Sequence, residues 1–539
     1  MSSFTSLDKR SDYESLIDYF KNNKDKPWAE WLNFGTVFNK LGKQGLVGIL
    51  TSKKNPDKQY VFKISQYINY LIQHESNVMK GLNQIALYCP HFCRTYGTIK
   101  SKINPKAEKS ANPFELNTKY SIEKEVLLCE YLDKSYKLCT YIRATKKINE
   151  NILYTTIKQV LLALTIAQKK KQLSHYDLHS NNIMMRKCDK NNVFLYVLDE
   201  DNQFCVPSFG HYPVIIDFGF SYIKDLDDGP LWPSLGHTHA GFMSDRFDWV
   251  ADPKLFLVTV SDEIKDIRCS KTAKKLRRIV RNMFFPLDID WECGWDNYKE
   301  EDNGGASGKV LEELEDCNDP SELFKEYDIY CIDLLQSLIP LPLQKQDYTN
   351  IKQSYKVFLS EWIKIEGQIS SHFYNMYILK GVIDAARTVG SAYHRSSTRP
   401  DALRTFKSCI LSRIDEVAKF CNPKNVNYDK MLCAILVFAK NLEGFLYDIL
   451  SKRMEEKQKQ YKKLPLQSVE QMYGAIEANI PDDYVYNKNT IITIINDINE
   501  TTTVYEMPEE YIDEINELHP MARGTFIYDL YKSEQEIII

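Results

Sequence analysis

Two short polar stretches constrain most strongly what this chain can fold into. Residues 175–182 read HYDLHSNN and place a carboxylate, Asp177, and an amide, Asn182, five positions apart on one polar loop. Residues 214–219 read VIIDFG, so that Asp217 and a glycine end a run of apolar β-formers. Phosphoryl transfer from a metal-bound nucleotide needs a carboxylate that orients the attacking hydroxyl, together with an amide and a second carboxylate that hold divalent ions. The two stretches, in this order, predict that chemistry.

Upstream, a lysine and a glutamate are candidates for a buried ion pair. Lys63 is the only charged residue of the strand-like run 59–64. Residues 65–86 have the apolar period of a helix, and Glu75 lies within the apolar stripe. Because an unpaired buried carboxylate costs several kcal/mol, Glu75 predicts a cationic partner, for which Lys63 is the candidate. The alternative is a lysine exposed on an edge strand and a surface glutamate unrelated to it.

Glycines precede the lysine in a segment that has the pattern of a strand, a turn and a second strand. Gly42, Gly45 and Gly48 all fall within residues 38–50. Glycine lets backbone amides approach phosphate oxygens because no Cβ stands in the way. An ordinary hairpin is the alternative, and the phosphate-binding interpretation depends on the residues that follow.

Together these stretches resemble the motifs of protein kinases. Residues 175–182 match the catalytic loop H-R-D-L-x-x-x-N, and residues 214–219 contain the D-F-G motif. Lys63 stands where the kinase strand V-A-I-K has its lysine. The glycine segment is similar to the kinase pattern G-x-G-x-x-G-x-V, in which Lys43 takes the place of the first glycine.

The resemblance implies a role for each polar residue of the site. Asp177 would act as the base, and Lys63, paired with Glu75, would contact the α- and β-phosphates of ATP. Asn182 and Asp217 would hold Mg²⁺, which bridges the phosphates. The implied cofactors are therefore ATP and Mg²⁺.

The resemblance also implies which residues line the nucleotide. Gly45 and Gly48 match the second and third glycines of the kinase pattern, and Gly42 stands one place before the first. Leu50 corresponds to the valine of that pattern.

The apolar run 125–132 would be the kinase hinge. Cys129 would be its gatekeeper, and the backbone of Glu130 and Leu132 would meet the adenine. A plain core strand is compatible with this assignment.

Two residues depart from the kinase pattern. Tyr176 replaces the arginine that pairs with a phosphorylated activation loop, so activation by such phosphorylation is not expected. His179 replaces the lysine that steadies the γ-phosphate in most Ser/Thr kinases, and we count it among the catalytic residues. The same pattern around His179 occurs in aminoglycoside and choline kinase relatives, and no A-P-E motif follows Ser221. The acceptor class stays open between a protein and a small molecule.

An insertion between the two polar stretches indicates a lineage. Apolar residues 193–198 and 204–206 flank a polar turn, which predicts a β-hairpin that extends a small sheet beside the cleft. With residues 215–221, this hairpin resembles the kinase-like proteins of large nucleocytoplasmic DNA viruses, including poxvirus and giant-virus relatives. The resemblance covers residues 35–260. It implies a serine/threonine-type viral kinase of the host cytoplasm or viral factory, with packaging in the virion left open.

The implied fold is α+β and bilobal, as in protein kinases. Residues 1–30 would form an N-terminal helical segment, and residues 31–132 an N-lobe with an antiparallel sheet and one helix. Residues 133–345 would form a mainly helical C-lobe, with the hairpin insertion at 186–212. Because the pattern from residue 346 to 539 is nearly all helical, we expect an all-α C-terminal extension, either packed on the C-lobe or free to bind a partner.

Two features of the second half each have two interpretations. Asp252 precedes the apolar run 253–257 and is either the aspartate that anchors a kinase helix or a plain helix N-cap. Residues 271–281 contain six Lys and Arg residues, which form either a patch for phosphate-rich or acidic substrates or a solvated helix face.

Composition limits the classes of protein to which the chain could belong. A chain of 539 residues is long enough for more than one domain, and its net charge of -4 argues against a general nucleic-acid binder. The 13 cysteines include no Cys-x-x-Cys pair, which argues against a zinc site and a disulfide framework. A protein of a reducing compartment is therefore the better interpretation. The N-terminus has no apolar signal core, and the longest strongly apolar run, 431–439, is too short to span a bilayer.

We therefore expect a divergent Ser/Thr protein kinase that uses ATP and Mg²⁺. Its partner would be a protein substrate, with no sequence-specific nucleic acid, no membrane span and a surface for partners on the C-terminal helices. The alternatives are a small-molecule kinase, and a pseudokinase scaffold that binds partners without catalysis.

Overall fold

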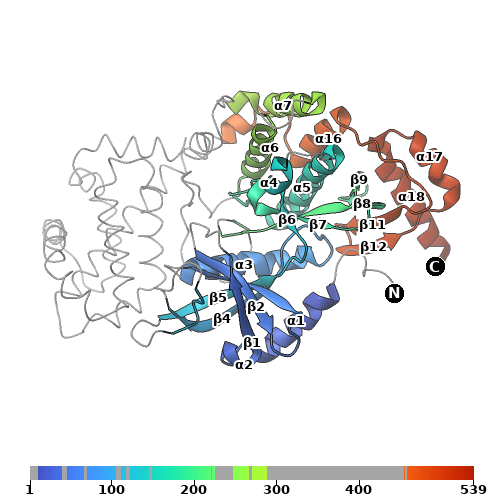
Figure 1. Ribbon diagram of the computed structural model, residues 1–539. Helices are drawn as coiled ribbons and strands as arrows, with labels where there is room; N and C mark the ends of the chain where they lie inside the picture. Colours follow the sequence, from blue (N-terminus) through green and yellow to red (C-terminus); the bar gives the residue numbers. More distant parts are fainter. Residues whose placement is uncertain are drawn as a thin grey trace, which may run out of the picture.

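The structure is a computed structural model that describes residues 10–38, 45–65, 69–104, 111–116, 122–144, 149–219, 221–224, 247–265, 270–287, 455 and 458–538. These residues form a mixed α and β architecture with a five-stranded, a three-stranded and a four-stranded sheet (Figure 1). In the described residues no helix is long and apolar enough to cross a membrane.

The five-stranded N-terminal sheet has the strand order β1-β2-β3-β5-β4, and every neighbouring pair is antiparallel. One face packs on helices α1 and α2, and the other face carries helix α3 (Figure 1). The strands are β1 (Leu32–Val37), β2 (Gly45–Ser52), β3 (Gln59–Ser65), β4 (Thr95–Ile103) and β5 (Ile122–Glu130). The helices are α1 (Arg10–Asn23), α2 (Trp28–Trp31) and α3 (Asn69–Ala86).

The sequence patterns located these elements, with one correction. The helices expected near the N-terminus and at 65–86 are present, as are the strands that carry Lys63 and Cys129. Strand β5 is longer than the apolar run 125–132 indicated, because it begins at Ile122 and pairs with β4, which extends to Ile103. The polar, lysine-rich ends of these strands pair with each other from Lys100 to Ile103, so backbone hydrogen bonding extends the hairpin beyond its apolar part.

Helix α5 (Glu150–Lys171) lies at the centre of the second part of the chain. The side chain of Asn149 caps its start by accepting a hydrogen bond from the Asn151 amide, and Gln172 ends it in a left-handed conformation. Nearly every residue from Ile152 to Ala167 is buried, so the helix is enclosed on all sides. Around it lie α4 (Leu138–Arg143), α6 (Ala251–Glu263), α7 (Lys271–Phe284), the short helices η1 (Ser180–Asn182) and η2 (Phe285–Leu287), and a sheet of β6 (Tyr136–Lys137), β7 (Ile183–Lys187) and β10 (His211–Ile215).

The predicted hairpin insertion is present, but it belongs to a different sheet from the one expected. Strands β8 (Asn192–Val197) and β9 (Gln203–Pro207) pair with each other in antiparallel fashion. They do not extend the β10-β7-β6 sheet; instead β8 pairs in parallel with β11 (Ile491–Asn496), and β12 (Thr501–Tyr505) completes the order β12-β11-β8-β9. In Figure 1 this C-terminal hairpin, coloured orange to red, lies beside the green β8–β9 hairpin.

The prediction of an all-α C-terminal extension was therefore wrong. The strand Ile491–Asn496 is buried at nearly every position because both faces of its sheet are covered, one by α18 (Pro520–Ile538) and the other by the main core. Helix α16 (Val469–Asn479) packs against α5, and η4 (Glu509–Tyr511) and α17 (Ile512–Glu517) precede α18. Residues 346–454 of the predicted helical extension, and the domain boundary at 345, lie outside the described residues.

Candidate functional site

The loop 175–182 is held in an unusual backbone conformation. Tyr176 has φ of 61°, a left-handed value that a bulky side chain rarely adopts. The carboxylate of Asp252, on α6, accepts the amide N–H of His175 at 2.6 Å and that of Tyr176 at 2.8 Å. Asp252 is buried, and these two bonds account for the conformation that the loop keeps. Of the two interpretations of this residue, the structure favours the loop anchor over the plain N-cap.

Asp177 and Asn182 contact each other within this loop. The Asn182 Nδ2 group donates to the backbone oxygen of Asp177 at 2.9 Å and to its Oδ2 at 3.1 Å. Since both amide hydrogens are used in this way, the Oδ1 oxygen of Asn182 is left for another partner. The backbone of Asn182 also accepts the amide of Ile216 at 3.0 Å, which joins the loop to the stretch that carries Asp217.

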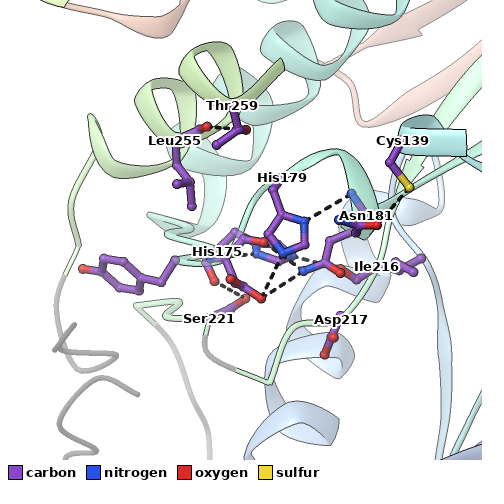
Figure 2. A network of polar contacts seen from close by, with 12 residues as sticks. Cys139, His175, His179, Asn181, Ile216, Asp217, Ser221, Leu255 and Thr259 are labelled. Carbon is purple, nitrogen blue, oxygen red and sulfur yellow. Dashed lines mark hydrogen bonds and ion pairs between the residues drawn. The ribbon is translucent and has the colours of Figure 1, made fainter. Parts of the chain in front are cut away.

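His179 lies against Asp177. Its Nε2 atom is 3.6 Å from Asp177 Oδ2, and its Nδ1 atom accepts the amide N–H of Asn181 at 3.2 Å. With Nδ1 acting as an acceptor, the neutral imidazole carries its proton on Nε2, toward the carboxylate. Figure 2 shows His175, His179 and Asn181 grouped on this loop, with Asp217 on the neighbouring segment. The side chain that replaces the usual lysine therefore faces the predicted base.

Lys63 lies between two carboxylates. Its Nζ atom is 2.6 Å from Glu75 Oε2 on α3 and 2.6 Å from Asp217 Oδ1. Burial acts to lower the pKa of the Lys63 ammonium, but the carboxylates of Asp217 and Glu75 outweigh burial and raise it above its ordinary value. The predicted Lys63–Glu75 pair is confirmed, and Asp217 joins it from 154 residues away. Asp217, with φ of 69°, is the second residue of the site in a left-handed conformation.

Two histidines fix the segment around Asp217. His175 donates from Nε2 to the backbone oxygen of Ile216 at 3.0 Å, next to Asp217. His74, next to Glu75 on α3, bonds through Nε2 to the backbone oxygen of Ser221 at 2.8 Å. Helix α3 is thereby joined directly to the chain that follows Asp217.

The alternation of strand β2 corrects one predicted site residue. Val47 lies opposite Lys63 in the β2–β3 ladder, so the two side chains share a face. Leu50 is three positions further along, on the opposite face, where it is fully buried with Tyr60. The prediction that Leu50 lines the nucleotide was wrong, because a shift of one residue along a strand reverses the face.

For the three glycines predicted to approach phosphate, the structure explains Gly48 by packing. A Cβ atom on Gly48 would lie 2.2 Å from the backbone oxygen of Thr36 and 2.6 Å from the Phe62 ring, so packing against β1 and β3 explains this glycine. Gly45 begins β2, and Gly42 lies outside the described residues. Contact of these glycines with phosphate stays a prediction.

The residues predicted around adenine lie on β5 and just beyond it. Cys129 is opposite Val61 of β3, and its Sγ atom is 3.8 Å from Met79 Sδ on α3. The amide of Glu130 donates to the backbone oxygen of Arg94 at 2.9 Å. An adenine contact at Glu130 would therefore use its carbonyl oxygen. Leu132 is buried in the main core cluster.

A second set of residues, which no sequence motif marks, supports the site. Arg94 binds both carboxylate oxygens of Glu130, at 2.9 and 2.6 Å, at the end of β5. Tyr461 donates to Asp248 Oδ2 at 3.0 Å, and the other oxygen of Asp248 caps the start of α6, which carries Asp252. No local pattern indicates either contact, because the partners lie 36 and 213 residues apart.

The donor set is compatible with Mg²⁺. Among the residues that the structure describes, no group of three or more His, Cys, Asp and Glu side chains could hold a metal ion by itself. Mg²⁺ is commonly bound by one or two protein oxygens together with phosphate oxygens and water. Asp217, with 41% of its side chain exposed, and the Oδ1 oxygen of Asn182 are hard oxygen donors of that kind.

Comparison with known proteins connects the chain to invertebrate iridescent viruses. It is similar to "Uncharacterized protein 098R" of Invertebrate iridescent virus 6, with 29% identity over 515 residues that cover 85% of each chain. It is also similar to "Uncharacterized protein 038R" of Invertebrate iridescent virus 3, with 25% identity over 87% of this chain and 88% of that protein. A third relative, "Probable kinase 098L" of Invertebrate iridescent virus 3, is 28% identical over 46% of this chain and 42% of its own length. No protein-family model matches the chain.

Proposed function

We propose that this protein is a viral kinase of bilobal fold that transfers the γ-phosphoryl group of ATP to Ser or Thr hydroxyls of proteins. The observation that carries the proposal is the convergence of Lys63, Glu75 and Asp217 within 2.6 Å contacts, next to the Asp177–Asn182 pair. These five residues come from β3, α3 and two separate loops. The relative named as a probable kinase supports the same class of reaction.

The residues have distinct roles in this proposal. Asp177, oriented by the amide of Asn182, would accept the proton of the attacking hydroxyl, and His179 would supply a hydrogen bond beside it. Lys63, held by Glu75, would bind the nucleotide phosphates and orient them toward the acceptor. The Asp252 bonds would keep the loop in place without contact with either substrate.

Asn182 and Asp217 would hold the magnesium ion. The ion, when bound with ATP, would neutralise charge that develops on the phosphates. Asp217 would serve both Lys63 and the ion, which its exposed side chain and second oxygen permit. The adenine would lie by Cys129 and the Glu130 carbonyl, on the face of the sheet that Lys63 occupies.

The test is transfer of labelled γ-phosphate from Mg-ATP to casein, basic protein and a panel of small-molecule acceptors. Asp177→Asn and Asp217→Asn should each lower the rate by at least about a hundredfold, because a base or a metal carboxylate is lost. Asp57→Asn is the matched control, since Asp57 is an exposed carboxylate in a turn away from the site. ATP binding is measured separately as a rise in melting temperature.

The pattern of transfer distinguishes the candidate functions. Transfer to protein Ser or Thr that is lost in both site variants and kept in Asp57→Asn supports the proposal. Transfer to small molecules alone selects a small-molecule kinase. ATP binding without transfer to any acceptor selects a scaffold.

A further inference from the structure

The C-terminal hairpin touches the end of the helix that carries Glu75. Tyr88 lies two residues after the end of α3, and its hydroxyl donates to Asp497 Oδ1 at 2.7 Å. The Thr502 hydroxyl donates to the backbone oxygen of the same tyrosine. Asp497 directly follows β11 and Thr502 lies near the start of β12, 409 and 414 residues further along the chain than Tyr88. In Figure 1 the right-hand end of α3 points to β12.

The contact between Tyr88 and Asp497 is buried and includes a charged group. Tyr88 is 2% exposed, and the Asp497 side chain is 1% exposed. Lys170 on α5 supplies a cation, with its Nζ atom 3.8 Å from Asp497 Oδ1 and 2.9 Å from Glu500 Oε1. A buried carboxylate needs such partners, so loss of the tyrosine hydroxyl leaves Asp497 with one fewer donor at a site from which water is excluded.

Helix α3 can transmit a shift of its end to Glu75. Ala86 lies eleven positions after Glu75, which corresponds to about 16 Å of continuous helix. The helix is also joined to α1, because Asn83 donates to the Tyr13 hydroxyl at 3.2 Å and to the Thr95 backbone at 2.8 Å. The position of the Lys63–Glu75 pair thus depends on contacts from outside the site.

We propose that Tyr88 and Asp497 are positioning residues, through which the C-terminal hairpin holds α3 where Glu75 meets Lys63. The consequence for phosphoryl transfer rests on the proposed function. The effect on the Lys63–Glu75 pair does not, since it is a property of the fold. Loss of the contact would let α3 move away from β3 and would leave Lys63 with Asp217 as its remaining carboxylate.

The test compares two matched Tyr→Phe changes in the full-length protein. Tyr88→Phe removes the bond to Asp497 and keeps the buried ring. Tyr505→Phe is the control, because it removes a 3.0 Å bond to Glu534 within the C-terminal region and leaves α3 untouched. A second variant, Thr502→Val, removes the other contact with similar shape.

Two readouts are independent of activity. In Tyr88→Phe and Thr502→Val, amide hydrogen exchange within residues 69–86 should speed up by about tenfold, because each variant loses one buried hydrogen bond. Lys63 should also react faster with an amine-acetylating reagent, measured by mass spectrometry, because it has lost Glu75. Unchanged exchange and labelling relative to Tyr505→Phe overturn the proposal, whether or not the protein is a kinase.

The third readout connects the contact to catalysis. If the wild type transfers phosphate, Tyr88→Phe should lower kcat about tenfold and leave the KM of the acceptor unchanged, since Glu75 does not meet the acceptor. A rate equal to that of Tyr505→Phe, despite faster exchange in α3, shows that the contact is structural only and overturns the positioning role. Absence of transfer in the wild type overturns the proposed function, and the first two readouts still decide whether the hairpin holds α3.

Discussion

At the scale of single residues, the carboxylate of Asp252 holds the backbone of the loop that carries Asp177. Its carboxylate satisfies two amides of a loop whose Tyr176 has an unfavourable φ of 61°. Asp252→Ala removes both acceptors, and we expect a loss of about 2–4 kcal/mol in the free energy of unfolding, from two buried donors left unpaired. Chemical denaturation measures this loss.

Asp252→Asn separates the loop geometry from the global stability. The amide keeps the volume but offers a single acceptor oxygen to the two amides, so one donor stays unpaired. If the proposed function holds, phosphate transfer should fall about tenfold while ATP binding persists, because the change loosens the loop and leaves Lys63 and its carboxylate partners in place. Equal losses of rate and of ATP affinity would contradict a role confined to the loop.

His91 makes stability depend on pH. The fully buried ring donates from Nδ1 to the Pro213 backbone at 2.8 Å and accepts from the Tyr196 hydroxyl at Nε2 at 2.7 Å. Burial lowers the pKa of His91 to about 4, below its unfolded value near 6.5. The unfolded chain therefore binds more protons between these values, so stability is lost as the pH falls from 6.5 to 4, by about 3 kcal/mol.

The variant His91→Gln tests this dependence. Glutamine can donate to Pro213 and accept from Tyr196 without titrating. Unfolding by urea between pH 4 and 7.5 should show a shallower fall for the variant than for the wild type. His74 should keep part of the slope, because burial also lowers its pKa to about 4. Parallel curves for the two proteins would refute the assignment.

At the scale of elements, helix α18 approaches strand β9 so closely that only glycine fits. A Cβ atom on Gly524 would lie 2.1 Å from the backbone oxygen of Gln203. Gly524→Ala should therefore destabilise the protein by about 1–3 kcal/mol, through displacement of the helix from the sheet. Gly474→Ala, in α16, is the matched control, since its nearest neighbour would be 4.0 Å away. It should stabilise by about 0.5–1 kcal/mol, because alanine favours the helix. Melting temperatures of the two variants should move in opposite directions.

Local patterns found the elements whose partners are close in sequence. The helix with Glu75, the strand with Lys63 and the β8–β9 hairpin all followed from periodicity and turn residues. The parallel pairing of β8 with β11 did not, because a parallel partner leaves no turn between the strands to mark it. Strand Ile491–Asn496 follows a long stretch of helical pattern, and we included it in the predicted helical extension.

The site was predictable to a similar extent. Asp177, Asn182, Lys63, Glu75 and Asp217 were selected from motif spacing, and the structure brings them together. Leu50 was placed on the wrong face because motif matching carries no strand register. Contacts such as Tyr461 with Asp248 depend on tertiary packing alone.

At the scale of the whole molecule, a buried ion pair joins the C-terminal region to the central helix. Lys158 on α5 and Glu477 on α16 are 2.7 Å apart, with side chains 1% and 2% exposed. Glu477→Gln should destabilise the protein by about 3–5 kcal/mol, because it leaves the lysine charge buried without a partner. The double variant Lys158→Met, Glu477→Leu should recover most of this loss, as measured by denaturant titration. Additive losses would show that the two residues are not coupled.

The parallel pairing of β8 with β11 also determines when the four-stranded sheet can be completed during synthesis. Thr493 reaches its partner Asn192 only after 301 further residues have left the ribosome. At about 5–20 residues per second this takes roughly 15–60 s, during which the edge of β8 has no neighbour on that side. An open strand edge invites pairing with other chains, so the nascent protein passes through a period of exposure to aggregation. Because the same late segment contacts Tyr88, this contact with the end of α3 forms only after Asp497 has been synthesised, 409 residues later.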